Sequence, residues 1–161
     1  MIRYARANDH PAIEAVVAAA FGRADEAELV ARLRDDGDVI FELVAEENGA
    51  VSGHILFSRL WADRSGLFGA LAPLAVRPEG QRAGVGSALV RASLDSAREF
   101  GCHGVLVLGD PAYYGRFGFS AQAAVDVRSP FTGLAAFQGL ALESAAFDGP
   151  LTVAYPSAFD G

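Results

Sequence analysis

Apolar residues recur along this chain in two ways, by the alternation that is typical of strands and at the three- and four-residue spacing of helices. Strands are expected where such runs are bounded by turn residues, at Ile2–Ala7, Glu42–Glu47, Val51–Ala62, Leu67–Val76, Val105–Leu108, Val125–Arg128, Phe137–Leu142 and Leu151–Tyr155. Helices are expected at Pro11–Phe21, Asp25–Arg34 and Gly84–Phe100, with a short one from Pro111 to Phe117. Interleaved strands and helices predict an α/β fold.

Two turn signals predict which strands pair as hairpins. Asn48-Gly49 separates two alternating segments and favours a tight turn, so residues 42–47 and 51–62 should run antiparallel. Phe147-Asp148-Gly149 suggests a closing hairpin between residues 137–142 and 151–155. The stretch from Phe131 to Ala136 fits neither strand nor helix clearly.

The segment Leu67–Val76 is nearly all apolar, which predicts a strand covered on both faces. Pro73 lies inside it, and a proline in a strand marks an edge or a bulge because it has no N–H to donate. The strand should therefore part from one neighbour near Pro73 and open a cleft. With the helix at 84–100 and the strand at 105–108 it forms a right-handed crossover unit with parallel strands.

A glycine-rich loop joins that strand to the long helix and reads Gln81-Arg82-Ala83-Gly84-Val85-Gly86. Unpaired N–H groups and the positive end of the helix dipole suit the start of a helix to a phosphate. A nucleoside-triphosphate loop is excluded, because Gly80 is not followed by its spacing or its lysine. A dinucleotide fingerprint is excluded because Leu89 stands where a third glycine is needed.

Length and charge narrow the range of partners. A chain of 161 residues, 52% of them hydrophobic, suits one domain with a sizeable core. The net charge of −7 argues against nucleic acid or an anionic membrane as partner and slightly favours a basic substrate. Arg77 and Arg82 flank the loop, either as phosphate partners or as solvated side chains. No targeting or membrane-spanning segment stands out, so a cytoplasmic protein is expected, and no metal site is predicted.

A second motif, Tyr113-Tyr114-Gly115-Arg116-Phe117-Gly118-Phe119, follows the loop. The loop and this motif together resemble the GNAT superfamily of acetyl-coenzyme-A-dependent N-acyltransferases, in particular a bacterial subgroup of predicted N-acetyltransferases. The resemblance covers essentially the whole chain and is strongest from Leu71 to Phe119. It implies a single domain over residues 1–161, with a mixed central sheet that is splayed next to the strand 67–76 and has helices on both faces.

The resemblance also implies roles for individual residues. Acetyl-coenzyme A (acetyl-CoA) would be the co-substrate, and the residues carried over to its binding are Leu74, Ala75, Val76, Gln81, Arg82, Ala83, Gly84, Val85, Gly86 and Ser87. Backbone groups of Leu74 and Val76 would pair with the pantetheine arm, and an N–H near Leu74 would face the thioester carbonyl. Tyr114 would be the general acid for the leaving thiolate, or else an aromatic residue packed over the cleft. Tyr113 is assigned to packing.

The general base stays open. Some relatives use a glutamate on the strand before the loop, but Leu67–Val76 contains no acidic residue, which leaves Asp110, His54 or a water chain. Gly109-Asp110 replaces the asparagine that many relatives carry here, which puts that coenzyme contact in doubt. The helices at 11–21 and 25–34 would border the acceptor site, where Asp25, Glu26 and Glu28 could meet an amine or simply face solvent.

Two functions follow. The first is transfer of an acetyl group from acetyl-CoA directly to a primary amine of a small molecule or protein. The alternative is an acyl-CoA-binding sensor of the same fold without turnover, which the missing strand glutamate favours. A phosphate- or nucleotide-binding domain of another class needs only the glycine loop, and the tyrosine motif disfavours it. A homodimer is left open.

Overall fold

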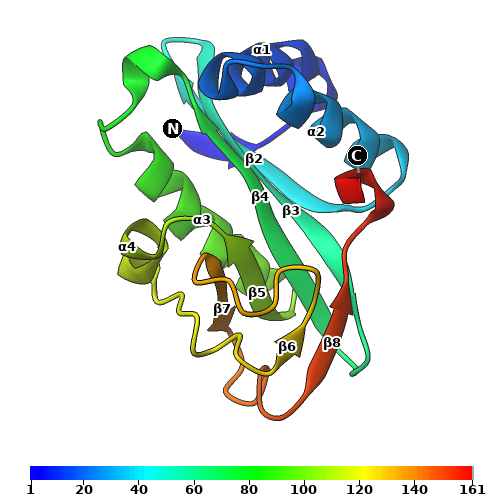
Figure 1. Ribbon diagram of the computed structural model, residues 1–161. Coiled ribbons are helices and arrows are strands. Elements are labelled where there is room, and N and C mark those ends of the chain that lie inside the picture. The colour runs from blue at the N-terminus through cyan, green and yellow to red at the C-terminus, as the bar shows by residue number, and fades with distance from the viewer. Residues whose placement is uncertain (161) are drawn as a thin grey trace.

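Strands from both halves of the chain form one mixed sheet in the computed structural model, which describes residues 1–160 (Figure 1). The strands are β1 Ile2–Tyr4, β2 Val39–Glu47, β3 Ala50–Ala62, β4 Leu67–Val76, β5 Cys102–Leu108, β6 Val127–Arg128, β7 Phe137–Ala141 and β8 Leu151–Ala154. Their order is β1-β2-β3-β4-β5-β7, and β8 pairs with the far end of β3 and with β6. The expected α/β fold with a mixed sheet is confirmed.

Helices cover both faces of this sheet. They are α1 His10–Phe21, α2 Asp25–Asp35, α3 Val85–Glu99 and the one-turn α4 Pro111–Tyr114. The helix α1 packs Ile13, Val16 and Val17 against the face that carries Val44 and Ala75. The helix α3 packs against the opposite face, with its buried residues Leu89, Val90, Leu94 and Ala97 in one cluster with Phe41, Leu43, Ile55, Phe57 and Leu71. Neighbouring residues of a strand point to opposite faces, and the two clusters follow this alternation.

Two local predictions are confirmed. Asn48 and Gly49 have φ angles of 52° and 78° and join β2 to β3 in an antiparallel hairpin. The strands β4 and β5 are parallel, and α3 connects them. Boundaries differ by a few residues, because β2 begins at Val39 rather than Glu42 and β1 ends at Tyr4 rather than Ala7.

The strand β4 parts from β5 where Pro73 predicts it. Pairing with β5 runs from Leu67↔Cys102 to Ala70↔Leu106 and stops there. Pairing with β3 continues to Gly53↔Val76, through an irregularity between Ile55↔Leu74 and Phe57↔Leu71 in which one residue of β3, Leu56, stands opposite two of β4. The second half of β4 therefore has one free edge.

The predicted closing hairpin is wrong. The strand β7 pairs antiparallel with β5, and β8 pairs with β3 and β6. The segment between them folds back over the sheet, because the Phe147 ring fills the space above Gly104 and Gly139. Arg64 holds this segment through hydrogen bonds to the carbonyl oxygens of Ala145, Ala146, Asp148 and Pro150. Within residues 1–160, every helix is too short or too polar to cross a membrane.

Candidate functional site

The free edge of β4 presents backbone groups of Leu74 and Val76. Arg77 donates its backbone N–H to Ser52 of β3 over 2.9 Å. Since successive residues of a strand point their N–H and C=O groups to alternate sides, Ala75 also faces β3 while Leu74 and Val76 face away from it. The Gln81 side chain donates to the Val76 carbonyl oxygen over 3.0 Å, which agrees with this direction. The edge has the form of a strand without a ladder partner.

The first turn of α3 lies next to this edge. Gly84 precedes the helix with a φ of 89°, a conformation that favours glycine. Ala88 donates to the Gly84 carbonyl oxygen over 3.0 Å, so the N–H groups of the three residues before Ala88 precede the intrahelical ladder. They point out of the helix end at which its dipole is positive, an arrangement suited to a phosphate.

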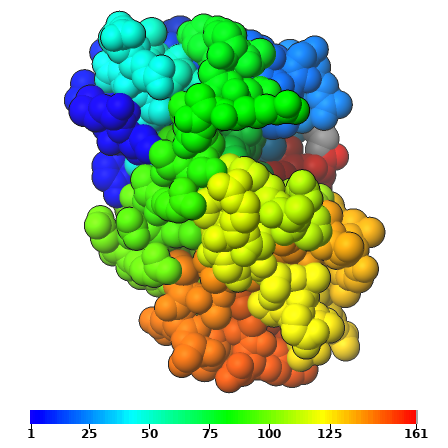
Figure 2. All heavy atoms as spheres, turned by 90° about the vertical axis from the view of Figure 1, so that its left-hand side faces the viewer, coloured from blue at the N-terminus to red at the C-terminus, as the bar shows by residue number. Residues whose placement is uncertain are grey.

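A groove of about 580 Å³ joins these two features. Its walls are Leu74, Val76, Gln81, Arg82, Gly84, Gly86, Ser87, Tyr113 and Arg116. In Figure 2 a hollow separates the loop after β4, in green, from the yellow-green segment that carries α4. The structure thus brings together most of the residues of the glycine loop and β4 that the sequence predicts to bind a cofactor.

Three nominated residues lie outside these walls. The Ala75 side chain is buried and faces α1. Val85 packs on the cluster beneath α3, and Ala83 is an exposed residue of the loop. Their side chains carry no groove contact, whereas their backbone N–H groups remain part of the loop and of the first helical turn.

The two tyrosines of α4 occupy different places. Tyr113 lines the groove, and its hydroxyl oxygen lies 3.0 Å from where a Cβ atom of residue 86 would stand. Arg116 lies over the Tyr113 ring, 5.5 Å from its centroid, and its Nη2 reaches Ser87 Oγ at 3.4 Å. Sequence reasoning missed Tyr113 and Arg116 as groove residues, because only the docking of α4 decides which of two adjacent side chains faces α3.

Tyr114 lies behind Tyr113. Its ring meets the Tyr113 ring edge-on at 5.0 Å and the Phe119 ring at 5.8 Å. Burial, with a smaller contribution from Tyr113, raises the pKa of Tyr114 to about 12. The phenol therefore keeps its proton throughout the neutral pH range, as a proton donor requires.

The candidate bases differ in access. The His54 side chain is 0% exposed, and its Nε2 lies 2.8 Å from Glu42 Oε1. Burial lowers the pKa of His54, so the imidazole is neutral and closed off from solvent. Asp110 is exposed at the start of α4, where its Oδ1 accepts the Ala112 N–H over 3.0 Å. Of these two residues, only Asp110 can meet a substrate.

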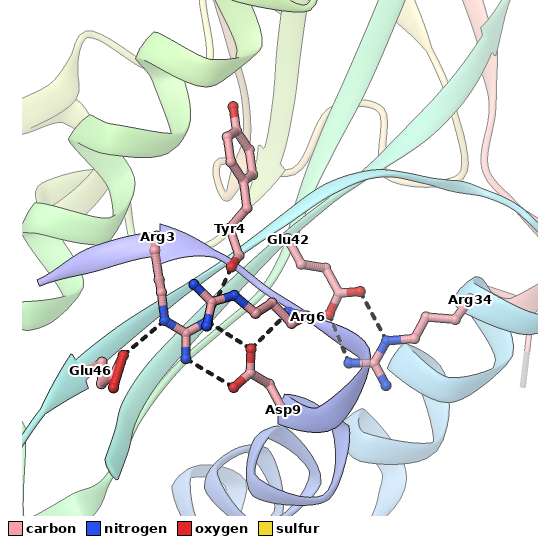
Figure 3. A network of polar contacts seen from close by, with 7 residues as sticks. All are labelled: Arg3, Tyr4, Arg6, Asp9, Arg34, Glu42 and Glu46. Atoms are coloured by element: carbon pink, nitrogen blue, oxygen red, sulfur yellow. Dashed lines mark hydrogen bonds and ion pairs between the residues drawn. The ribbon is translucent and has the colours of Figure 1, made fainter. Parts of the chain in front are cut away.

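Figure 3 shows the ion pair between Arg34 and Glu42 and, beside it, the polar contacts around Arg3. Arg34 of α2 donates to both Glu42 oxygens, at 2.8 and 2.9 Å. Burial raises the pKa of Glu42, but hydrogen bonds from His54 and Arg34 outweigh it and lower the pKa to about 2. Arg3 binds Asp9 and Glu46 beside it. These contacts join α1 and α2 to the sheet and play a structural part.

Other charged candidates are accounted for by local contacts. Arg77 donates to the Val51 carbonyl oxygen over 2.7 Å, so it clamps the loop to β3, while Arg82 is exposed at the groove. On α2, Glu26 is paired with Arg23 at 2.8 Å, and Glu28 is exposed. Cys102 is buried in the core, and this burial raises the pKa of its thiol to about 11.

A strand that parts from its neighbour beside the open start of a helix, with an aromatic helix across the gap, is the arrangement of a coenzyme-A-dependent acyltransferase. The model of the acetyltransferase (GNAT) family matches residues 6–119, and the chain belongs to this family.

Relatives agree with this membership. The chain is 40% identical over 144 residues to the uncharacterized N-acetyltransferase YhbS of Escherichia coli (strain K12), covering 88% of this chain and 86% of that protein. The crystal structure of Escherichia coli YhbS in complex with CoA matches with a TM-score of 0.91 at 36% identity, over 100% of this chain and 92% of that one. A GNAT acetyltransferase from Brucella melitensis in complex with acetyl-CoA matches with a TM-score of 0.84 at 36% identity, over 99% and 97%.

Proposed function

We propose that this chain transfers an acetyl group from acetyl-CoA directly to a primary amine. The observation that carries the proposal is the groove between the free edge of β4 and the first turn of α3. It offers a strand edge and a cluster of N–H groups side by side, which suits a ligand with an amide-containing arm and a pyrophosphate. The complexes of the two similar proteins with CoA and acetyl-CoA support the same ligand.

The residues divide the binding between them. The N–H groups of Val85, Gly86 and Ser87 receive the pyrophosphate, with Arg82 as a nearby positive charge. The outward backbone groups of Leu74 and Val76 pair with the pantetheine arm. Gln81 already donates to the Val76 carbonyl oxygen at 3.0 Å, and that oxygen has a second lone pair with which it can accept from the arm.

The chemistry is a single displacement. The amine nitrogen attacks the thioester carbonyl carbon and forms the C–N bond, the C–S bond breaks with its electron pair passing to sulfur, the nitrogen releases a proton as the amide forms, and the thiolate takes up one. An N–H near Leu74 stabilises the oxyanion, a contribution typically worth about 3 kcal/mol when the donor is preorganised. Tyr114 supplies the proton to the sulfur, since its raised pKa keeps it protonated.

The ammonium form of the acceptor must lose its proton before it attacks. Asp110 is the side chain that we assign to this step, alone or through water, because it is exposed and adjoins α4 whereas His54 is sealed beneath α1 and α2. The aspartate that caps α4 would then also mark where the acceptor amine enters.

A non-catalytic acyl-CoA sensor of the same fold is the second candidate. It is favoured by the lack of any acidic residue on β4 and by the position of Tyr114, behind the groove wall formed by Tyr113. For either candidate we propose a cytoplasmic location, and we leave a homodimer as an assembly to be tested by ultracentrifugation.

Calorimetry and turnover separate the candidates. Acetyl-CoA and CoA should bind with similar affinity, while ATP, which lacks the pantetheine arm, should bind more weakly. Tight binding of ATP without CoA would contradict the acyltransferase. An amine panel with thiol release as the readout then decides between enzyme and sensor, because a sensor binds CoA and releases no thiol above the rate of hydrolysis without enzyme.

A further inference from the structure

Gly109 follows the last residue of β5 and is fixed through both of its backbone polar groups. Its N–H donates to the Ala136 carbonyl oxygen over 3.0 Å. Its own carbonyl oxygen accepts from Gln138 Nε2 over 3.1 Å. Position 109 therefore cannot shift without breaking contacts to the segment that leads into β7.

The Tyr114 ring occupies the space where a side chain at position 109 would begin. A Cβ atom built on Gly109 would lie 2.5 Å from Tyr114 Cε2 and 3.0 Å from Cδ2. The Tyr113 and Phe119 rings contact Tyr114 edge-on, and the Tyr114 backbone N–H donates to the Asp110 carbonyl oxygen over 3.0 Å. The ring thus rests on Gly109 and has little room to move away.

The side chain of Gln138, on β7, fixes the backbone of Gly109 on which the ring rests. This side chain is 1% exposed, and Nε2 donates to Ala136 as well as to Gly109, at 3.3 and 3.1 Å. Burying an amide is costly, the more so because Gln138 Oε1 has no hydrogen-bond partner within the described residues, and an apolar residue would fill this place at lower cost. Gln138 therefore donates both to the Gly109 carbonyl oxygen and to the Ala136 carbonyl oxygen that accepts the Gly109 N–H, and these bonds fix the backbone position of Gly109.

We propose that Gly109 and Gln138 are positioning residues for Tyr114: Gly109 is the seat of the phenol ring, and Gln138 fixes that seat against β7. The inference rests on the proposed role of Tyr114 as the proton donor. A methyl group at position 109 displaces the ring and moves the hydroxyl away from the sulfur, while the edge of β4 and the first turn of α3, which bind the coenzyme, stay in place.

The first test is Gly109→Ala. We expect kcat to fall about tenfold to a hundredfold, as displacements of about 1 Å at a reacting centre do. The KM for acetyl-CoA should stay within about twofold, because the edge of β4 and the first turn of α3 are unchanged. Gly115→Ala is the matched control, since Gly115 has a φ of −58° and nothing within 4 Å of a new Cβ atom. It should retain kcat. A native kcat in Gly109→Ala overturns the inference.

Gln138 is tested by a pH profile. In Gln138→Glu the ionised carboxylate faces two carbonyl oxygens, and only the protonated form can donate to one of them. We expect kcat to be low at pH 8 and to recover, relative to the native enzyme, as the pH is lowered to 5.5. Gln138→Met should show a low kcat without this recovery. Parallel pH profiles for the native enzyme and Gln138→Glu would contradict the role of Gln138.

A double-mutant cycle separates this inference from the proposed function and does not depend on the Gln138 variants folding. If Gly109 acts through the Tyr114 hydroxyl, Gly109→Ala should cause no further loss of kcat in a Tyr114→Phe background. Native turnover in Tyr114→Phe would remove Tyr114 as the acid. A low kcat in Tyr114→Phe with native turnover in Gly109→Ala would refute only the positioning role of Gly109. The same conclusion would follow if the two single losses of kcat simply multiplied in the double variant.

Discussion

The Tyr113 hydroxyl oxygen stands 3.0 Å from the position of a Cβ atom at Gly86, so the second glycine of the loop is packed against α4. That distance is shorter than ordinary van der Waals contact, and any side chain at position 86 must displace the tyrosine. The glycine therefore lets α4 close against the start of α3 and shapes the groove from the protein side.

Gly86→Ala should weaken coenzyme A binding about tenfold, or about 1.4 kcal/mol, because the displaced Tyr113 narrows the groove. Tyr113→Phe removes the hydroxyl that causes the clash. The double variant Gly86→Ala/Tyr113→Phe should therefore regain most of the affinity, and Tyr113→Phe alone should bind nearly as well as the native chain. Calorimetry with CoA measures all four proteins. If the double variant binds as weakly as Gly86→Ala, the methyl group obstructs the ligand itself.

Tyr114→Phe should lower kcat at least about tenfold with little change in coenzyme affinity, since it removes a proton donor and keeps the ring. Thiol release at saturating acetyl-CoA measures kcat, and calorimetry measures affinity. Tyr155→Phe is a control that alters another half-buried phenol, one that packs against Phe131 and Phe159 far along the chain. Equal turnover in both variants would exclude Tyr114 from the mechanism.

The groove could be predicted from sequence because its determinants are local. Pro73 cannot donate to a ladder; it lies in the irregularity of the β3–β4 pairing, and the pairing of β4 with β5 ends close by, at Ala70. The positive φ of Gly84 and the hairpin turn at Asn48-Gly49 are likewise properties of one or two residues.

Features that depend on distant partners could not be predicted. The strands β7 and β8 pair with β5 and β3 rather than with each other, because Phe147 and Arg64 fold the segment between them over the sheet. Which of Tyr113 and Tyr114 faces the groove depends on how a single helical turn docks. The burial of His54 depends on its register with Val44 and Ala75 beneath α1.

The backbone conformation at position 84 explains why a glycine stands there. Its φ is 89°, and nothing lies within 4 Å of a Cβ atom built there. Gly84→Val should strain the helix start by about 1–2 kcal/mol and disturb the N–H cluster, so CoA binding should be lost or strongly weakened. Gly84→Asn, which tolerates positive φ, should keep much of the affinity. If asparagine and valine weaken binding equally in calorimetry, close approach of the ligand rather than strain explains the glycine.

His54 predicts how stability depends on pH. Burial lowers its pKa in the folded state, so the folded chain keeps it neutral while the unfolded chain takes up a proton below about pH 6.5. The free energy of unfolding should therefore fall as the pH drops from 6.5 to 5, by up to about 1.4 kcal/mol per pH unit from this residue. The carboxylates of Glu42 and Asp9, whose pKa values are lowered to about 2, contribute only at lower pH, where the unfolded chain protonates them.

The variant His54→Gln isolates this contribution. Glutamine can still donate to Glu42 but cannot titrate, and the other two of the three histidines stay in place. Urea denaturation at pH 7.5, 6.5 and 5.5 should give a steeper loss of stability for the native chain than for the variant. Since His54 is sealed from solvent, thiol release by the variant at pH 7.5 should stay close to native. Parallel pH dependences would contradict a neutral buried His54, and a loss of kcat beyond tenfold would return His54 to the list of bases.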